Sequence, residues 1–271
     1  MITGASSGFG EDAARLFAAE GCKLVLAARR LERLESVADE IRSRGGEVLV
    51  VQADVSEHKE IELLVSRAVD HFGRIDILFN NAGFGRVNWL EGQDPEYDIE
   101  AQVRVNLLGT IQVTRAVLPQ MLERRKGHII NMSSVAGLIP APLMSIYCVT
   151  KSGIRAFSDA LRREVSPFGI QVSTIYPGPA KTEFGLHLGE SEARHAASKI
   201  TNWSMSSEYV ARRIVDLAKR PRRSLVIPFW FLPLVTINNI FPGMVDWILG
   251  NFFVNRYHKL DAGASHDTST S

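Results

Sequence analysis

The sequence has few cysteines, no excess of charge of one sign and no internal repeat. Its 271 residues include only two cysteines, Cys22 and Cys148, which stand in unrelated contexts without CxxC or metal-ligand spacing. We therefore expect a reduced intracellular compartment and no disulfide framework. The seven histidines form no cluster in the sequence, so we predict no metal site.

Charge is nearly balanced, with 31 basic and 30 acidic residues and a formal net charge of +1. This balance gives no indication of a nucleic-acid partner. No basic segment followed by an apolar one opens the chain, so we expect no secretory signal. The small polar tail 261–271 is predicted to be disordered, and residues 1–260 are predicted to form one large α/β domain.

Apolar, β-rich runs alternate with helical patterns along the chain. The helical patterns include residues 31–44, 58–72 and 155–166. Strand, helix and strand repeated at this spacing predict right-handed βαβ units around a parallel sheet. The runs are continuously apolar, as strands buried on both faces of a doubly wound sheet require. The expected strands after the first are 23–27, 47–51, 74–79, 127–133, 170–176 and 224–228.

A glycine-rich turn, TGASSGFG (3–10), lies at the start of the chain and precedes a helical run. Glycines at Gly4, Gly8 and Gly10 would let the backbone turn tightly and approach a pyrophosphate. The positive N-terminal end of the following helix would then face the phosphate charge. The turn therefore favours a dinucleotide site, with a purely structural Gly/Ser turn as the alternative.

The end of the second expected strand indicates which dinucleotide is bound. A free ribose 2′-hydroxyl is usually met by an acidic side chain about 20 residues past the turn. Here Ala27 and Ala28 stand at that place, and Arg29 and Arg30 follow. Guanidinium groups bind a 2′-phosphate bidentately, so we predict NADP(H) rather than NAD(H). The alternative is that both arginines only face solvent at a strand end.

Three residues form a candidate proton-transfer group. Tyr147 and Lys151 are four residues apart at the start of an expected helix, so their side chains share one face. Ser134 lies at the end of strand 127–133, thirteen residues before Tyr147. A lysine ammonium stabilises a tyrosine anion, and a serine hydroxyl can orient a substrate oxygen. The Tyr–Lys spacing alone would also fit an ordinary exposed helical pair.

With these motifs the sequence resembles a single-domain short-chain dehydrogenase/reductase of the NADP-preferring type. The matching motifs occur in the family's order and spacing over residues 3–182. The resemblance implies a doubly wound α/β Rossmann fold with seven parallel strands, and hydride transfer between a nicotinamide and a carbonyl or alcohol. The matching pieces are TGASSGFG (3–10), ADV (53–55), NNAG (80–83), Asn106 in VNLLG, Ser134 in SSVAG, Tyr147 and Lys151 in YCVTK, and PGPAKT (177–182).

The resemblance also implies a role for each catalytic candidate. Tyr147 would be the general acid/base, Lys151 would lower its pKa and hold the nicotinamide ribose, and Ser134 would steady the substrate oxygen. Asn106 would keep a water for proton relay. The family's thirteen-residue spacing to Tyr147 favours Ser134 over its neighbour Ser133.

Other matching residues would line the cofactor. Asp54 and Val55 would meet the adenine, residues 81–83 would border the adenosine side, and residues 177–182 would lie along the nicotinamide and its phosphate. A polar turn, a loop breaker or an amide bonded to backbone are the structural alternatives for these short motifs. The complete set predicted to bind the cofactor is Gly4, Ser6, Ser7, Gly8, Phe9, Gly10, Arg29, Arg30, Asp54, Val55, Asn81, Ala82, Gly83, Tyr147, Lys151, Pro177, Gly178 and Thr182.

The first strand departs from the family pattern. The family has a hydrophobic strand of about five residues before the turn, and here only Met1 and Ile2 precede it. That strand would lie at the centre of the sheet, so its shortening would expose ladder groups of its neighbours and loosen the turn. We therefore expect a truncated first strand, and we hypothesise that the chain starts inside a longer reading frame.

A second departure is the apolar segment 225–254, within a C-terminal extension that spans 225–258. Prolines and polar residues interrupt it, so it is not expected to cross a bilayer. Four interpretations are open: packing on the core, a lid over an apolar substrate pocket, a dimer contact, or contact with a membrane surface through Trp230 and Trp247.

We therefore predict an NADP(H)-dependent oxidoreductase that acts on a carbonyl or secondary alcohol of a hydrophobic small molecule. A non-catalytic NADP(H)-binding sensor or scaffold is the alternative function. We expect a cytoplasmic homo-oligomer, a dimer or tetramer, with seams along helices 98–122 and 145–166 and with peripheral membrane contact as an open alternative. Segment 184–206, which should cover the substrate, carries no recognisable chemistry.

Overall fold

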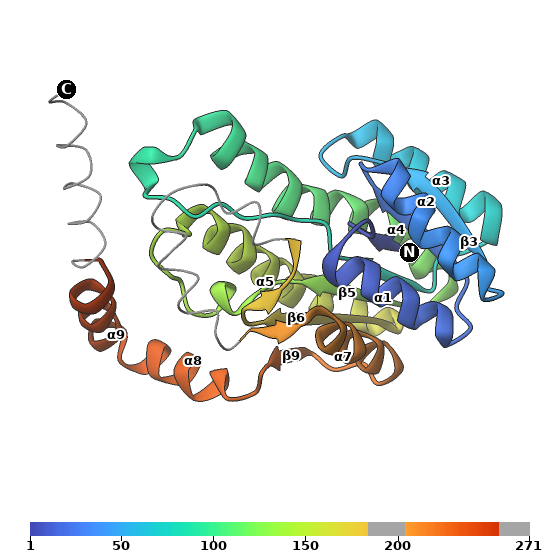
Figure 1. Cartoon of the computed structure of the whole chain (residues 1–271). Helices are drawn as coiled ribbons and strands as arrows, with labels where there is room; N and C mark the ends of the chain where they lie inside the picture. Colours follow the sequence, from blue (N-terminus) through green and yellow to red (C-terminus); the bar gives the residue numbers. More distant parts are fainter. Residues whose placement is uncertain (184–203, 255–271) are drawn as a thin grey trace, which may run out of the picture.

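The computed structural model describes residues 1–183 and 204–254. Its main feature is a seven-stranded parallel sheet in the order β3-β2-β1-β4-β5-β6-β9, with helices on both faces (Figure 1). The predicted doubly wound Rossmann sheet is confirmed. The strands are β1 (Ile2–Thr3), β2 (Leu24–Ala28), β3 (Val48–Gln52), β4 (Ile77–Asn80), β5 (Gly127–Met132), β6 (Ile170–Pro177) and β9 (Ser224–Ile227).

The strands lie close to their predicted positions because their apolar runs are buried on both faces. All five residues of β2 and all six of β5 are buried. Strand β4 begins at Ile77, later than expected; Arg74 and Asp76 before it form an exposed side-chain ion pair at 3.1 Å, and the Asp76 carbonyl still accepts the His128 N–H of β5 at 2.9 Å. The predicted tail 261–271 and residues 184–203 of the predicted substrate-covering segment lie outside the described residues.

Two groups of helices cover the sheet. Helices α1, α2 and α7 bury their apolar residues against one face, and α3, α4 and α5 bury theirs against the other. The helices are α1 (Gly8–Ala19), α2 (Leu31–Ser43), α3 (His58–Phe72), α4 (Thr110–Arg124), α5 (Ser145–Val165), α7 (Ser207–Lys219), α8 (Phe231–Ile240) and α9 (Pro242–Leu249).

Helix α3 illustrates how the sequence sets a helix and its end. Ile61, Leu64 and Ala68 are its buried residues, at a spacing that places them on one side. The helix ends at Gly73, whose φ of +77° is left-handed and whose N–H donates to the Val69 carbonyl.

The expected helix 98–122 divides into three parts. Two π-helical stretches, Pro95–Glu100 and Val103–Gly109, precede α4. The first begins at Pro95 because the Asp94 carboxylate caps it by accepting the N–H groups of Glu96 and Tyr97. Asn106 lies in the second stretch and is fully buried.

Strand β1 is short, as predicted, and lies at the sheet centre. It pairs with β2 and β4, and Ile2 is only 2% exposed. Met1 extends the ladder, since its amino group donates to the Ile77 carbonyl at 2.8 Å and its carbonyl accepts the Phe79 N–H at 2.9 Å. The neighbours' ladder groups are therefore paired beside residues 1–3, contrary to our expectation.

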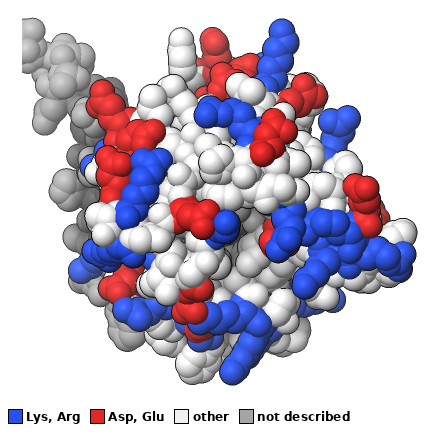
Figure 2. Space-filling model, turned by 90° about the vertical axis from the view of Figure 1, so that its right-hand side faces the viewer, with Lys and Arg blue, Asp and Glu red and all other residues white. Residues whose placement is uncertain are grey.

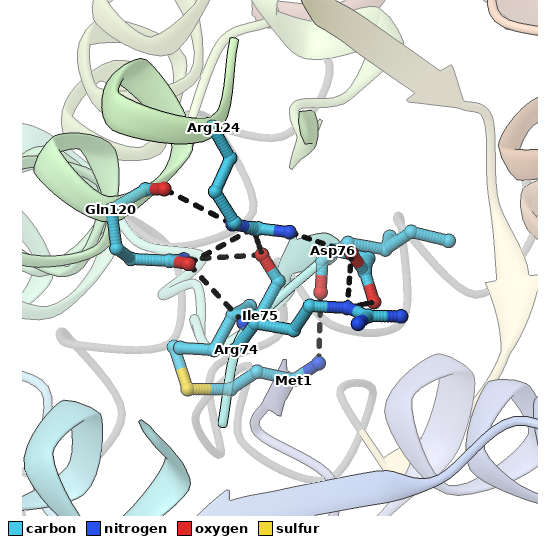
Figure 3. Close-up of polar contacts among 7 residues, drawn as sticks. Met1, Arg74, Ile75, Asp76, Gln120 and Arg124 are labelled. Atoms are coloured by element: carbon cyan, nitrogen blue, oxygen red, sulfur yellow. Dashed lines mark hydrogen bonds and ion pairs between the residues drawn. The ribbon is translucent and has the colours of Figure 1, made fainter. Parts of the chain in front are cut away.

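Helix α4 fixes the chain that leads into β4 (Figure 3). The Gln120 side chain accepts the Ile75 N–H and donates to the Ile75 carbonyl, at 3.4 and 3.1 Å. The Arg124 guanidinium donates to the same carbonyl at 2.7 Å and to Asp76 at 2.9 Å. These contacts hold the start of β4 beside Met1.

The face beside α2, α3 and β3 carries both basic and acidic side chains (Figure 2). Many are paired within a helix or between neighbours; Arg42 bonds Asp39 on α2 at 2.9 Å, and Arg15 of α1 bonds Glu40 of α2 at 2.8 Å. Such exposed pairs contribute little to stability.

The C-terminal extension differs from our expectation in two ways. Residues 225–227 belong to β9 and therefore to the main sheet. The next two helices, α8 and α9, project from the body of the protein and bury none of their described residues, so the interpretation that they pack on the core is wrong (Figure 1). In the described part of the chain no single helix is long and apolar enough to cross a membrane, while α8 and α9, bent by 109°, meet that length and composition only as a pair.

Segment 184–206 also contains an element that the sequence did not predict. Met205–Ser206 forms a strand, β8, which pairs in parallel with β7 (Ala180–Lys181) in a second, two-stranded sheet. This pairing places the start of α7 beside the chain that leaves β6.

Candidate active site

The glycine-rich turn leads from β1 into α1 at the carboxyl edge of the sheet, where the strand order reverses between β1 and β4. Gly4 and Gly8 have φ of +65° and +55°, a region that favours glycine. A Cβ at Gly4 would lie 2.8 Å from Ala82 Cα, and one at Gly10 would overlap the Gly4 carbonyl oxygen. The turn therefore needs glycine at these positions to approach its neighbours.

Residues after β4 hold this turn in place. The Asn81 side-chain amide donates to the carbonyls of Thr3 and Gly4, each at 3.1 Å. In return, the Thr3 hydroxyl accepts the N–H groups of Asn81 and Ala82, also at 3.1 Å. The turn is thus tied across the sheet to Asn81 and Ala82, in addition to its connection to β1.

The start of α1 fits an anionic ligand. Ser7 is the N-cap, and within the described residues its side chain makes no capping hydrogen bond to the helix. The first N–H groups of α1 are therefore available to a phosphate, as at other anion-binding helix N-termini. Together with the glycine cradle, this geometry fits the pyrophosphate of a nicotinamide dinucleotide.

The two arginines after β2 have different partners. Arg30 donates to the Ser6 hydroxyl and to the Ser6 carbonyl of the turn, each at 3.3 Å, and bonds Glu183 at 2.9 Å. Arg29 is more exposed and lies 3.7 Å from Asp54. The interpretation that both arginines only face solvent is therefore wrong for Arg30, which contacts the predicted cofactor turn.

Arg33 and Glu183 lie beside this turn and were not among the predicted site residues. Arg33 donates to Glu183 at 2.6 Å from the first turn of α2. The available signal was the spacing of three residues between Arg30 and Arg33, which places both on one side of the chain as it enters the helix.

The structure brings Ser134 and Tyr147 together. They share a hydrogen bond, and Ser134 Oγ also accepts the Ala136 N–H at 3.1 Å and donates to the Pro177 carbonyl at 3.4 Å. Ser133 instead donates to the Lys151 carbonyl at 2.8 Å, which fixes the start of α5 to β5. The serine beside the tyrosine is therefore the predicted one.

Lys151 is buried close to Tyr147. Its Nζ lies 5.5 Å from the centre of the Tyr147 ring and donates to the Met132 carbonyl at 3.0 Å. Burial lowers the pKa of Lys151 to about 8. A Cβ at Gly83 would lie 3.4 Å from this Nζ and 2.9 Å from Asn106 Oδ1, so the NNAG segment connects the group to the glycine-rich turn.

The pKa of Tyr147 departs from the sequence-based expectation. Burial raises it above its usual value, and the Ser134 hydrogen bond offsets only part of that effect. Lys151 does not dominate in this structure, because its ammonium is directed to the Met132 carbonyl. A phenol with a raised pKa stays protonated at neutral pH and is placed to donate a proton.

The Asn106 side chain is bonded to backbone. Its amide donates to the Phe84 carbonyl at 2.7 Å and to the Thr150 hydroxyl at 3.2 Å, and its Oδ1 accepts the Phe84 N–H at 2.9 Å. The backbone carbonyl of Asn106 accepts the Thr110 hydroxyl at 2.8 Å. Asn106 therefore holds the loop after NNAG in place, and its role in a proton relay stays a prediction.

The remaining predicted residues lie along the same edge. Asp54 accepts the Ser56 N–H at 2.9 Å, and Val55 is buried. The Gly178 N–H donates to the Ile227 carbonyl at 2.7 Å, and a Cβ at Gly178 would lie 2.9 Å from the ring of Phe231. Thr182 faces Gly8, since a Cβ there would meet its side chain at 3.4 Å.

The fold and this edge of the sheet define a nicotinamide-dinucleotide oxidoreductase of the Rossmann type. The model of the short chain dehydrogenase family matches residues 1–193, and the chain belongs to this family. The resemblance stated from the motifs is thereby confirmed.

Two relatives illustrate the similarity. An uncharacterised oxidoreductase of Staphylococcus saprophyticus is 35% identical over 235 residues, covering 86% of this chain and 94% of the relative. An 11-beta-hydroxysteroid dehydrogenase-like 2 protein of Arabidopsis thaliana is 32% identical over 256 residues, covering 94% of this chain and 81% of the relative.

Solved structures are similar as well. A short chain dehydrogenase/reductase of Burkholderia phymatum in complex with NAD has a TM-score of 0.81 at 28% identity, covering 88% of this chain and 91% of that one. A short-chain dehydrogenase of Sphingobium yanoikuyae in complex with NADPH has a TM-score of 0.75 at 27% identity, covering 100% and 94%. These neighbours support a nicotinamide cofactor and include both cofactor types.

Proposed function

We propose that this chain transfers a hydride between NADP(H) and a carbonyl or secondary alcohol of a hydrophobic small molecule. The observation that carries the proposal is the buried group of Ser134, Tyr147 and Lys151, which Gly83 connects to the glycine-rich turn. The Asn81 contacts position the turn itself.

Each residue of the group has a distinct task. The bound nicotinamide supplies or accepts the hydride. The Tyr147 hydroxyl passes the proton to or from the substrate oxygen, and Ser134, hydrogen bonded to Tyr147, holds that oxygen. Lys151, with a pKa of about 8, is mostly charged at neutral pH and favours negative charge that develops on the phenol oxygen.

The preference for NADP(H) is supported by Arg30 and by the residues before it. Arg30 lies against Ser6 of the turn, and Ala27 and Ala28 occupy the strand end where an acid would bind a free ribose 2′-hydroxyl. The raised pKa of Tyr147 keeps the phenol protonated, which suits reduction of a ketone.

Tyr147→Phe tests the chemistry and also the alternative of a non-catalytic binding module. We would measure NADPH oxidation with aliphatic, aromatic and steroid ketones, together with NADPH binding by fluorescence titration. Loss of the proton donor should lower turnover by roughly 10²- to 10⁴-fold while NADPH binding changes only a few-fold. NADPH binding without turnover of any ketone by the wild-type protein would favour the sensor or scaffold.

The exposed helices α8 and α9 support a hydrophobic substrate and contact with a lipid surface. Residues 224–245 contain no charged side chain. The exposed residues Leu232, Leu234, Ile237 and Ile240 lie around much of the α8 circumference. A protein partner covers one face of a helix, whereas acyl chains surround all of it, so this pattern favours lipid.

The geometry of α8 and α9 fits one leaflet. At 1.5 Å per residue the helices are about 15 and 12 Å long, near half of a hydrocarbon core of about 30 Å. Phe231, the first residue of α8, approaches Gly178 beside the predicted nicotinamide region, so the lipid surface would adjoin the substrate entrance.

Flotation with liposomes tests this contact. The wild-type chain should float, and Trp230→Glu with Trp247→Glu should not, while both proteins keep the same NADPH affinity. Absence of the wild-type protein from the lipid fraction would remove the membrane proposal without affecting the proposed chemistry. The dimer or tetramer with seams along residues 98–122 and 145–166 stays a prediction, supported by exposed Leu108 and Val149 in these two segments.

A further inference from the structure

Two guanidinium groups converge on one carboxylate beside the glycine-rich turn. Arg30 binds Glu183 Oε2 at 2.9 Å and Arg33 binds Oε1 at 2.6 Å, so each oxygen has its own arginine. Arg30 is also fixed to the turn through Ser6. Arg29 is directed elsewhere, towards Asp54. The structure thus contains a two-arginine anion site that already holds an anion from the chain itself.

We propose that Glu183 is an internal competitor for the 2′-phosphate of NADP(H), and that Arg33 joins Arg30 as a determinant of cofactor specificity. The inference rests on the proposed NADP(H) preference and extends it. A phosphate monoester carries up to two negative charges and three acceptor oxygens, and guanidinium groups bind both phosphate and carboxylate bidentately. The phosphate and the Glu183 carboxylate therefore compete for the same donors.

The cluster of Arg30, Arg33 and Glu183 is exposed to solvent, which makes it easy for a phosphate to displace the Glu183 carboxylate. The side chains of Arg30, Arg33 and Glu183 are 46%, 55% and 31% exposed, so solvent screens both ion pairs. Arg30 holds the pKa of Glu183 below its usual value, so the carboxylate is ionised and competes at neutral pH. Displacing it costs little, and a dianion gains more from the same two arginines.

Glu183 also connects this site to the chain that leaves β6. It directly follows Thr182, whose side chain faces Gly8, and β7 lies just before it. A purely structural role is the competing explanation: Glu183 would then only fasten residues 180–183 to the turn. The two roles predict opposite effects of removing its charge.

The test compares two nucleotides that differ only by the phosphate. We would measure the Kd of 2′,5′-ADP and of 5′-ADP by calorimetry for the wild-type chain, Glu183→Gln, Arg33→Gln and the double variant. Removing the competitor should tighten 2′,5′-ADP binding roughly three- to tenfold. Arg33→Gln should weaken it roughly tenfold. Binding of 5′-ADP should change less than about twofold in each case.

Matched controls remove similar charges away from the turn. Arg44→Gln lies at the far end of α2, and Glu208→Gln lies on α7, and neither should change the ratio of the two Kd values. Thermal unfolding of each variant establishes that it is folded. In the Arg33→Gln background, Glu183→Gln should tighten 2′,5′-ADP binding by a smaller factor than in the wild type. The reason is that Glu183 has already lost one of its two arginine partners in that background.

The outcomes separate this inference from the function on which it rests. If the wild type binds 2′,5′-ADP no more tightly than 5′-ADP, the NADP(H) preference fails and the inference fails with it. The other outcome is that the wild type prefers 2′,5′-ADP but Glu183→Gln weakens binding of both nucleotides or leaves the ratio of the two Kd values unchanged. Glu183 then only holds residues 180–183 to the turn, and only the inference is overturned.

Discussion

Gly10 is the position in the opening turn with the least room for a side chain. In an ordinary helix, Gly→Ala stabilises by up to about 1 kcal/mol because alanine has the higher helix propensity. At Gly10, however, the added Cβ would overlap the Gly4 carbonyl oxygen and lie 2.6 Å from Asn81 Nδ2. The neighbours are backbone and an amide already bonded to Thr3 and Gly4, so neither can move aside without losing contacts.

The cost of Gly10→Ala follows from these contacts. Overpacking of this kind costs about 1–3 kcal/mol, and loss of one or two Asn81 hydrogen bonds costs about 1 kcal/mol each. We therefore expect a net destabilisation of about 1–4 kcal/mol after the gain in helix propensity. NADPH binding should weaken at least tenfold, because the turn moves away from its place at the start of α1.

Urea unfolding and NADPH titration check this prediction. Gly243→Ala is the matched control: it is also helical and has a negative φ, but a Cβ there meets nothing within 4 Å among the described residues. It should be neutral or slightly stabilising. If Gly10→Ala is as stable as Gly243→Ala and binds NADPH with unchanged affinity, close approach is not what requires glycine in the turn.

Three further predictions concern stability and are checked by urea unfolding. Burial lowers the pKa of His128 from 6.5 to about 4, so folding favours the neutral ring. The free energy of unfolding should therefore keep its full value above pH 6.5 and fall by about 3 kcal/mol as the pH drops to about 4. His128→Gln should reduce this dependence on pH. Asn106→Ala should cost about 2–4 kcal/mol because the Phe84 N–H and carbonyl lose their partner, whereas Asn239→Ala on exposed α8 should cost almost nothing. Gly73→Ala should cost only about 1 kcal/mol, from its φ of +77°, since a Cβ there has open space; a loss above about 3 kcal/mol would contradict this.

The sheet and most helices could be predicted because the residues that become buried form local apolar patterns in the sequence. The run LVLAA at β2 is apolar throughout, and Ile61, Leu64 and Ala68 mark one side of α3. The start of β4 was predicted too early, because the charged residues Arg74 and Asp76, whose side chains pair at the surface, precede its first strand residue, Ile77. The assignment of residues 1–260 to one domain and the oligomeric state stay predictions.

The contacts of the site were less predictable because they join distant residues. The motif spacing predicted that Ser134, Tyr147 and Lys151 lie together. It did not predict the direction in which the pKa of Tyr147 is shifted, because that direction depends on burial. The pairing of Arg33 with Glu183 joins residues 150 positions apart and leaves no local pattern. The projection of α8 and α9 likewise could not be read from their apolarity, which would fit a core helix equally well.

The tie between Asn81 and the glycine-rich turn also has a consequence for folding during synthesis. The turn leaves the ribosome before Asn81, whose amide bonds Thr3 and Gly4 from 78 and 77 residues further along the chain. Contacts of such long sequence separation form slowly, because the intervening chain must first be ordered. We therefore expect the nascent chain to complete the predicted cofactor turn only after β4 has joined β1, so dinucleotide binding would report assembly of the sheet centre and not of the N-terminal segment alone.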